Sequence, residues 1–171
     1  HSMPIETMNW QWTPYTILLM ATSGVALLSA YYARRRRVPW IHTGIALLLA
    51  GAVWSFFYAL ELASPRLEAK ILWSKVQYLG IVAIPIAWAA FVLQYTGREG
   101  WLKYALPVVA ALSLISLVLV WSNERHHLMW SEMALHRESY LGRSYPDLTK
   151  TNAIGYWYFI AYSGLTVVAG V

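Results

Sequence analysis

Two charged residues lie inside apolar stretches and are the first candidates for chemistry. Glu61 is near the end of the stretch 39–62, and Lys75 is near the start of the stretch 70–95. A charge inside a membrane-length stretch is costly, so it usually faces protein or water and often marks a functional site. The lysine side chain is long enough to reach toward Glu61, and a Glu61–Lys75 pair would lower the cost of both charges. The pair would then act as a ligand site or switch; alternatively, each side chain contacts headgroups and water by itself.

Aromatic side chains are frequent near the same ends of these stretches. Rings with a few polar groups are typical linings of ligand pockets, but membrane proteins also collect rings at the headgroup layer. For most rings taken singly we favour headgroup-layer or core packing, whereas Trp88 and Tyr162 lie deeper in their stretches and are better interior candidates. The rings concerned are Trp54, Tyr58, Trp73, Tyr78, Trp88, Trp157, Tyr158 and Tyr162.

Three histidines, His126, His127 and His136, follow the fourth apolar stretch. Two helical histidines that bind one metal ion are usually four residues apart, and adjacent side chains point apart. No cluster of acidic residues at ligand spacing lies nearby, so we expect no metal site. Histidine titrates near neutral pH, but packing within this segment is the simpler interpretation.

The sequence lacks the common catalytic and cofactor-binding motifs. None of GxGxxG, GxxxxGK[ST], GxSxG or HExxH occurs, and acidic residues in the apolar stretches are too sparse for a proton relay. The chain has no cysteine, so it forms no disulfide and no thiolate metal site. We therefore expect neither catalytic residues nor a cofactor in this chain.

Composition places the chain among polytopic α-helical membrane proteins. Of its 171 residues, 58% are hydrophobic and only 12% are charged, whereas a soluble domain has about 25% charged residues. The net charge of +5 does not indicate nucleic-acid binding, because much of it is the run Arg34–Arg37 beside an apolar stretch. We expect an all-α bundle with membrane lipids as partners and about five transmembrane helices, near residues 14–33, 39–62, 70–95, 102–121 and 153–171.

The basic residues predict the orientation of this bundle. By the positive-inside rule, Arg34–Arg37 and Arg98 lie in the cytoplasm, and so the N-terminus and the segment 122–152 lie outside. Binding of anionic lipid by the arginine run is a less favoured alternative. Residues 1–13 form an external segment, with His1 and Ser2 a tag remnant.

The helix starting at Pro14 has a recognisable beginning, because Thr13 suits the capping position and proline suits the first helical position. At the other end of the chain, the last apolar stretch reaches Val171 without a basic stop. We therefore expect more chain to follow it.

The segment 122–152 is the longest polar one, yet it contains much apolar surface. Such surface is rarely left in water, so we expect the segment to be ordered and to pack over the outer end of the bundle. The apolar residues concerned are Leu128, Met129, Trp130, Met133, Leu135, Tyr140 and Leu141.

Four segments follow one another in a recognisable order. They are Glu61-Leu-Ala63; Trp73-Ser-Lys-Val-Gln-Tyr78 with Gly80, Pro85, Trp88, Phe91 and Gln94-Tyr-Thr-Gly97; Trp121-Ser-Asn-Glu-Arg-His-His-Leu-Met-Trp130; and Gly155-Tyr-Trp-Tyr158 with Tyr162. Together they resemble the N-terminal seven-transmembrane region of bacterial and archaeal histidine kinases, over nearly the whole chain. The chain departs from that family in length, because two further helices and any cytoplasmic module are absent.

The resemblance implies a sensory input domain of a two-component histidine kinase in the inner (plasma) membrane. In such a protein a signal outside or within the bundle shifts helices, and the full-length kinase acts as a homodimer. A transporter or channel subunit, the input domain of a diguanylate cyclase, and a purely structural anchor are the alternatives. A transporter should show repeats, broken helices and polar residues at the membrane midplane. Here the polar residues gather in the outer third and only Pro85 breaks a stretch near its centre, which favours a sensor.

We expect the ligand site between the stretches 39–62, 70–95 and 153–171, opening outward and covered by the segment 122–152. Lys75 would pair with an acidic group of the ligand, or with Glu61 when the site is empty, and the ligand would be a small aromatic acid, a lipid fragment or a peptide. The expected ligand-binding residues are Trp54, Tyr58, Glu61, Lys75, Tyr78, Trp88, His127, Trp130, Trp157, Tyr158 and Tyr162.

Overall fold

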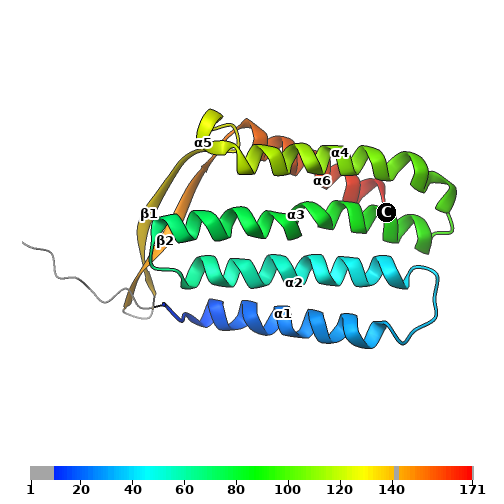
Figure 1. The fold of residues 1–171 in the computed structure, drawn as a ribbon, viewed down its shortest axis with the longest axis horizontal. Coiled ribbons are helices and arrows are strands. Elements are labelled where there is room, and N and C mark those ends of the chain that lie inside the picture. The colour runs from blue at the N-terminus through cyan, green and yellow to red at the C-terminus, as the bar shows by residue number, and fades with distance from the viewer. Residues whose placement is uncertain (1–9, 141–142, 171) are drawn as a thin grey trace, which may run out of the picture.

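The computed structural model describes residues 10–140 and 143–170 and contains a helical bundle with one β-hairpin (Figure 1). The long helices are α1 (Pro14–Ala33), α2 (Ile41–Ala63), α3 (Leu67–Tyr95), α4 (Leu102–Trp121) and α6 (Ile154–Ala169). A 3₁₀ turn, η1 (Glu99–Trp101), precedes α4, and a short helix, α5 (Asn123–His126), follows it. The strands β1 (Trp130–Tyr140) and β2 (Arg143–Asn152) connect α5 to α6.

Four helices are long and apolar enough to cross a membrane: Pro14–Ala33, Ile41–Ala63, Leu67–Tyr95 and Glu99–Trp121. The fifth expected span is α6, which is apolar but has only 16 residues. At 1.5 Å per residue it covers about 24 Å, less than the roughly 30 Å of a hydrocarbon core. Four helices among the described residues therefore satisfy the length criterion, and the fifth expected span stays a prediction.

The start of α1 agrees with the sequence prediction. Thr13 is the N-cap, its side chain accepts a hydrogen bond from the backbone N–H of Thr16 at 3.2 Å, and Pro14 takes the first helical position. Just before this cap, the N–H of Gln11 donates to the carbonyl oxygen of Ala63 at 2.8 Å. This bond joins the segment before α1 to the last residue of α2.

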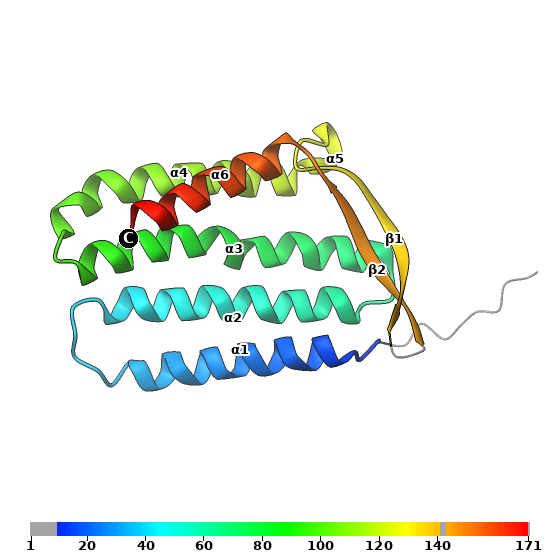
Figure 2. The same cartoon turned by 180° about the vertical axis from the view of Figure 1, so that it is seen from behind.

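Helix α3 is central to the bundle. Helices α1, α2 and α3 run antiparallel in a row, and α4 and α6 lie on the other side of α3 (Figures 1 and 2). Its most apolar part is 44% buried, against 17–22% for the other three long helices. The helix continues through Pro85 and contributes more buried residues than any other described helix.

Small residues allow α2 and α3 to pack at very short range. A Cβ atom placed on Gly80 would lie 2.6 Å from both the carbonyl oxygen of Ala50 and the backbone nitrogen of Trp54. On the other side of α2, the Ser23 hydroxyl donates to the carbonyl oxygen of Ala52 at 3.0 Å. The sequence signal for this packing is the run of small residues in the first half of α2.

Most of the described chain is helical, as expected for an all-α bundle, but Trp130–Tyr140 and Arg143–Asn152 pair as antiparallel strands and form a hairpin. Trp130 pairs with Asn152 at its base, and His136 pairs with Asp147 further along. A two-stranded hairpin is marginal by itself; this one lies across the end of the bundle, over the start of α3 and toward α1 (Figures 1 and 2).

The hairpin segment packs on the bundle with only part of its apolar surface. Met129, Trp130 and Leu148 are buried, whereas Leu128 and Leu135 are exposed. The expectation that the segment is ordered and covers this end is therefore met near the hairpin base. The side chains of Tyr140 and Leu141 lie outside the described residues.

Candidate functional site

The hairpin is joined to the helices by a group of four buried residues and one half-buried lysine, which we call the hairpin–bundle junction: Glu61, Gln77, Tyr78, Trp130 and Lys150. Glu61 is 3% exposed at the end of α2. Its Oε1 accepts from the Lys150 ammonium at 2.8 Å, and its Oε2 accepts a short hydrogen bond from Gln77 Nε2. Both carboxylate oxygens therefore have partners, which a buried charge requires.

Lys150 of β2 also lies over the indole ring of Trp130, 5.4 Å from its centroid. Trp130 is 1% exposed and meets Tyr78 of α3 edge to face at 5.5 Å. A cation over an indole face and an edge-to-face ring pair are both favourable arrangements. One strand of the hairpin is thus tied to α2 through an ion pair, and the other strand is tied to α3 through ring packing.

The Glu61–Lys75 pair expected from the sequence is not formed. The Lys75 ammonium lies 2.6 Å from Glu124 Oε1, while Glu61 pairs with Lys150. The reason is that residues 122–152 fold back over the bundle and bring one acid and one lysine to this end. The Glu124 side chain is 67% exposed, and the hydrogen bond and positive charge of Lys75 lower the pKa of its carboxyl group.

Asn123 fixes the turn that leads from α4 into the hairpin. Its Oδ1 accepts from the backbone N–H groups of Met129 and Trp130 at 2.9 and 3.0 Å, and its Nδ2 donates to the carbonyl oxygen of Trp130 at 3.0 Å. Asn123 is fully buried. All polar atoms of its side chain are therefore used to hold this turn.

The two adjacent histidines in this turn have different surroundings. His126 accepts from the backbone N–H of Leu128 at 2.9 Å and lies 2.9 Å from the Ser122 hydroxyl. His127 is exposed and has a left-handed backbone with φ of 52°. The described residues contain no group of three potential metal ligands.

A third lysine, Lys70, is fully buried at the same end. Its ammonium donates to the carbonyl oxygens of Glu61 at 2.8 Å and Leu62 at 3.3 Å. These are among the last carbonyls of α2, which lack helical partners and carry the negative end of the helix dipole. Lys70 thus holds the start of α3 against the end of α2.

The candidate aromatic residues are not gathered around one cavity. Tyr78, Trp130 and Tyr162 are buried, and with Phe159 they belong to one packed apolar cluster between α3, α6 and the hairpin. Rings therefore fill the space between α3, α6 and the hairpin. The expected site was between α2, α3 and α6, and in the structure α2 and α6 lie on opposite sides of α3 (Figures 1 and 2). Trp54, Tyr58 and Trp157 are exposed, and Trp88 and Tyr158 are half-buried.

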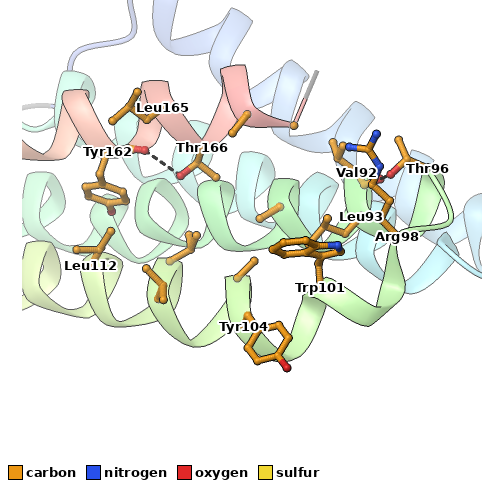
Figure 3. A pocket seen from close by; sticks show the side chains of 16 residues that line it. Val92, Leu93, Thr96, Arg98, Trp101, Tyr104, Leu112, Tyr162, Leu165 and Thr166 are labelled. Carbon is orange, nitrogen blue, oxygen red and sulfur yellow. Dashed lines mark hydrogen bonds between the residues drawn. The ribbon is translucent and has the colours of Figure 1, made fainter.

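A groove of about 540 Å³ lies between α3, α4 and α6, toward the end of the bundle opposite the hairpin (Figure 3). Its lining is mostly apolar, with Thr96, Arg98 and Trp101 at one end and Tyr162 at the other. Tyr162 is the one residue of the expected ligand set on this groove. A smaller hollow of about 360 Å³ between α4 and α6 is bordered by Tyr158.

The sequence pointed to Glu61, Tyr78 and Trp130, but it missed the partners that join them to the hairpin. Lys150 lies 89 residues from Glu61, and nothing in the local pattern links the two. Lys70 and Glu124 carried a weak signal, since each is a charge within a few residues of an apolar stretch. Sequence-distant ion pairs of this kind require the tertiary structure.

Comparison with known proteins gives one match. The family described as the N-terminal 7TM region of histidine kinase matches residues 18–171. Searches of curated proteins and of solved structures gave no match.

Proposed function

Because the chain belongs to the family of N-terminal seven-transmembrane regions of histidine kinases, we propose that it detects a ligand outside the cell or within the membrane. The chain is then a multi-pass sensor region of the inner (plasma) membrane, with the N-terminus and the hairpin outside. Helix movement passes the signal to a cytoplasmic module that acts as a homodimer. The Arg34–Arg37 run at the opposite end supports this orientation, because basic residues favour the cytoplasmic side.

The observation that carries the proposal is the buried Glu61–Lys150 ion pair between α2 and the hairpin. A ligand that moves the hairpin separates this pair and leaves Glu61 as an uncompensated buried charge. Such a charge is unstable unless it finds a new partner, so α2 and α3 must rearrange with the hairpin. A local change of ion-pair partners is a common way of biasing a helical bundle between two states.

The distribution of buried charge favours a sensor over a transporter. Among the described residues, the buried charged side chains are Glu61, Lys70 and Lys75, and all three lie near the hairpin. A transporter places its polar binding groups near the membrane midplane, in broken helices. The ligand contacts remain those proposed from the sequence, of which Trp54, Tyr58, His127 and Trp157 have exposed side chains.

The test is a set of Lys150 variants in the full-length kinase, reconstituted in vesicles, with autophosphorylation as the output. Lys150→Met keeps the apolar stem but removes the charge. Because buried Glu61 then lacks its cationic partner, the protein loses about 1–3 kcal/mol of stability. We expect a changed basal autophosphorylation rate in Lys150→Met and a nearly normal one in Lys150→Arg.

Lys103→Met is the matched control, because Lys103 is exposed near the opposite end of the bundle. Thermal unfolding of every variant separates loss of folding from loss of signalling. If folded Lys150→Met has the same basal and stimulated rates as the natural protein, the junction does not carry the signal.

A further inference from the structure

A hollow of about 470 Å³ lies at the connection between α1 and α2. This connection is at the end of the bundle opposite the hairpin (Figure 1). Its lining is partly basic (Arg34, Arg36 and Arg37, called the rim below) and partly apolar (Val38, Ile41 and Ile45, called the floor below). The lining residues are Arg34, Arg36, Arg37, Val38, Ile41, His42 and Ile45.

The arginines of the rim have no acidic partner within the part of the chain that the structure describes. The two ion pairs among the described residues, Lys75–Glu124 and Lys150–Glu61, are both at the hairpin end. Arg35, which is not part of the rim, lies near the rings of Tyr31 and Tyr32, at 5.8 and 5.9 Å from their centroids. Three neighbouring guanidinium groups repel one another, and a bound anion removes that repulsion.

The floor of the hollow extends along α2. Ile41 and Ile45 are one helical turn apart, so they lie on the same face of α2, and Val38 precedes them in the connection. Ile41 is buried, and Val38 and Ile45 are half-buried. This apolar strip leads from the arginines into a helix that is long and apolar enough to cross a membrane.

A ligand that matches both the arginines and the apolar strip of the hollow has an acidic head and an apolar chain. A free phosphate ion would contact the rim and leave the apolar floor uncovered. Exposed Tyr31 and Tyr32 lie at the same end of α1, and tyrosines at this depth are typical of the headgroup layer. The position of the hollow therefore fits a lipid of the surrounding leaflet.

We propose that this hollow binds an anionic phospholipid of the cytoplasmic leaflet. Arg36 and Arg37 hold the phosphate by paired, charge-assisted hydrogen bonds, and the first part of an acyl chain lies over Ile41 and Ile45. This site is separate from the hairpin–bundle junction and does not depend on ligand sensing there, but its assignment to the cytoplasmic leaflet rests on the orientation given with the proposed function. Occupancy of the hollow at the α1–α2 connection therefore depends on how much anionic phospholipid the membrane contains.

The experiment uses the full chain purified in micelles doped with phosphatidylglycerol or phosphatidylcholine, and native mass spectrometry counts the lipids retained. We expect phosphatidylglycerol to be retained in preference. Arg36→Gln and Arg37→Gln should each weaken its binding by about fivefold, since one basic residue near an anionic lipid contributes a factor of that size. Lys103→Gln removes a charge at the same end of the bundle, outside the hollow, and should change nothing.

Two further variants keep the test decisive if a glutamine variant fails to fold. Arg37→Lys retains the charge but lacks the planar fork, so it should bind phosphatidylglycerol less well than the natural protein. Ile45→Ser should weaken binding of the lipid, while glycerol phosphate alone competes poorly with it. Equal retention of the two lipids, an equal loss in Lys103→Gln, or full displacement by glycerol phosphate would overturn the proposal.

Discussion

At the scale of single residues, the end of the bundle beneath the hairpin depends on polar side chains whose hydrogen-bonding capacity is used. Glu61 binds both Lys150 and Gln77, and Asn123 makes three hydrogen bonds to the backbone of the turn. A buried polar group costs free energy when its partner is lost. These residues therefore specify one arrangement of the hairpin over the helices.

Asn123→Ala should destabilise the protein by about 1–3 kcal/mol, because it leaves buried backbone groups of Met129 and Trp130 without partners. Thermal unfolding in detergent measures this loss. Arg125→Ala is the control, since Arg125 is exposed on the same short helix. Equal unfolding temperatures for the two variants would contradict the role given to Asn123.

At the scale of elements, α2 and α3 cross at very short range at Gly80. Any side chain at Gly80 would meet backbone atoms of α2, which cannot move aside as a flexible side chain can. The sequence indicated close packing through the small residues of α2, but not which glycine of α3 lies at the contact. That position depends on how the two helices are rotated and shifted relative to each other, and the sequence of either helix alone does not determine this.

Gly80→Ala should destabilise the bundle by about 1–3 kcal/mol or more, because overpacking forces the two helices apart. Gly51→Ala is the matched control, since a Cβ atom there meets open space. In this control, alanine stabilises the helix by up to about 1 kcal/mol relative to glycine. Denaturation in mixed micelles compares the two, and a loss of equal size in both would argue against a close crossing at Gly80.

The hairpin was the element that sequence patterns identified least well. Its strands contain charged residues and Pro146, and Leu141-Gly142 is not a strong hairpin-turn pair such as Asn-Gly. Its base is held by contacts with α2 and α3, made by Lys150 and Trp130. The segment was expected to be ordered because of its apolar content, yet its strand structure depends on these distant partners.

At the scale of the whole molecule, the charges are divided between the two ends of the bundle. The junction and the hairpin occupy one end, and the arginine hollow occupies the other (Figure 1). The proposed orientation places the first end outside the cell and the second in the cytoplasm, as the positive-inside rule predicts. Helices α2 and α3 run from one end to the other, and in the proposed function they carry the signal between these ends.

Labelling of single cysteines tests this orientation, and the natural chain has none to interfere. Glu132→Cys in β1 and Glu99→Cys in η1 place exposed thiols at opposite ends. A membrane-impermeant maleimide should label position 132 in intact cells and position 99 only after lysis. The natural protein is the unlabelled control, and the reverse pattern would show that the assigned topology is inverted.

The sequence by itself determined the family, the helical membrane class and the start of α1. These properties depend on local patterns: runs of apolar residues, a Thr-Pro cap and segments in a fixed order. It also identified Glu61 and Lys75 as charges that need partners. The tertiary structure alone decided those partners, Lys150 and Glu124, together with the strand structure of Trp130–Tyr140 and Arg143–Asn152 and the packing of Tyr78, Trp130 and Tyr162 into one cluster. The physical reason is that ion pairs, ring packing and hairpin docking join residues far apart in the chain, and their energies depend on distances that no local pattern encodes.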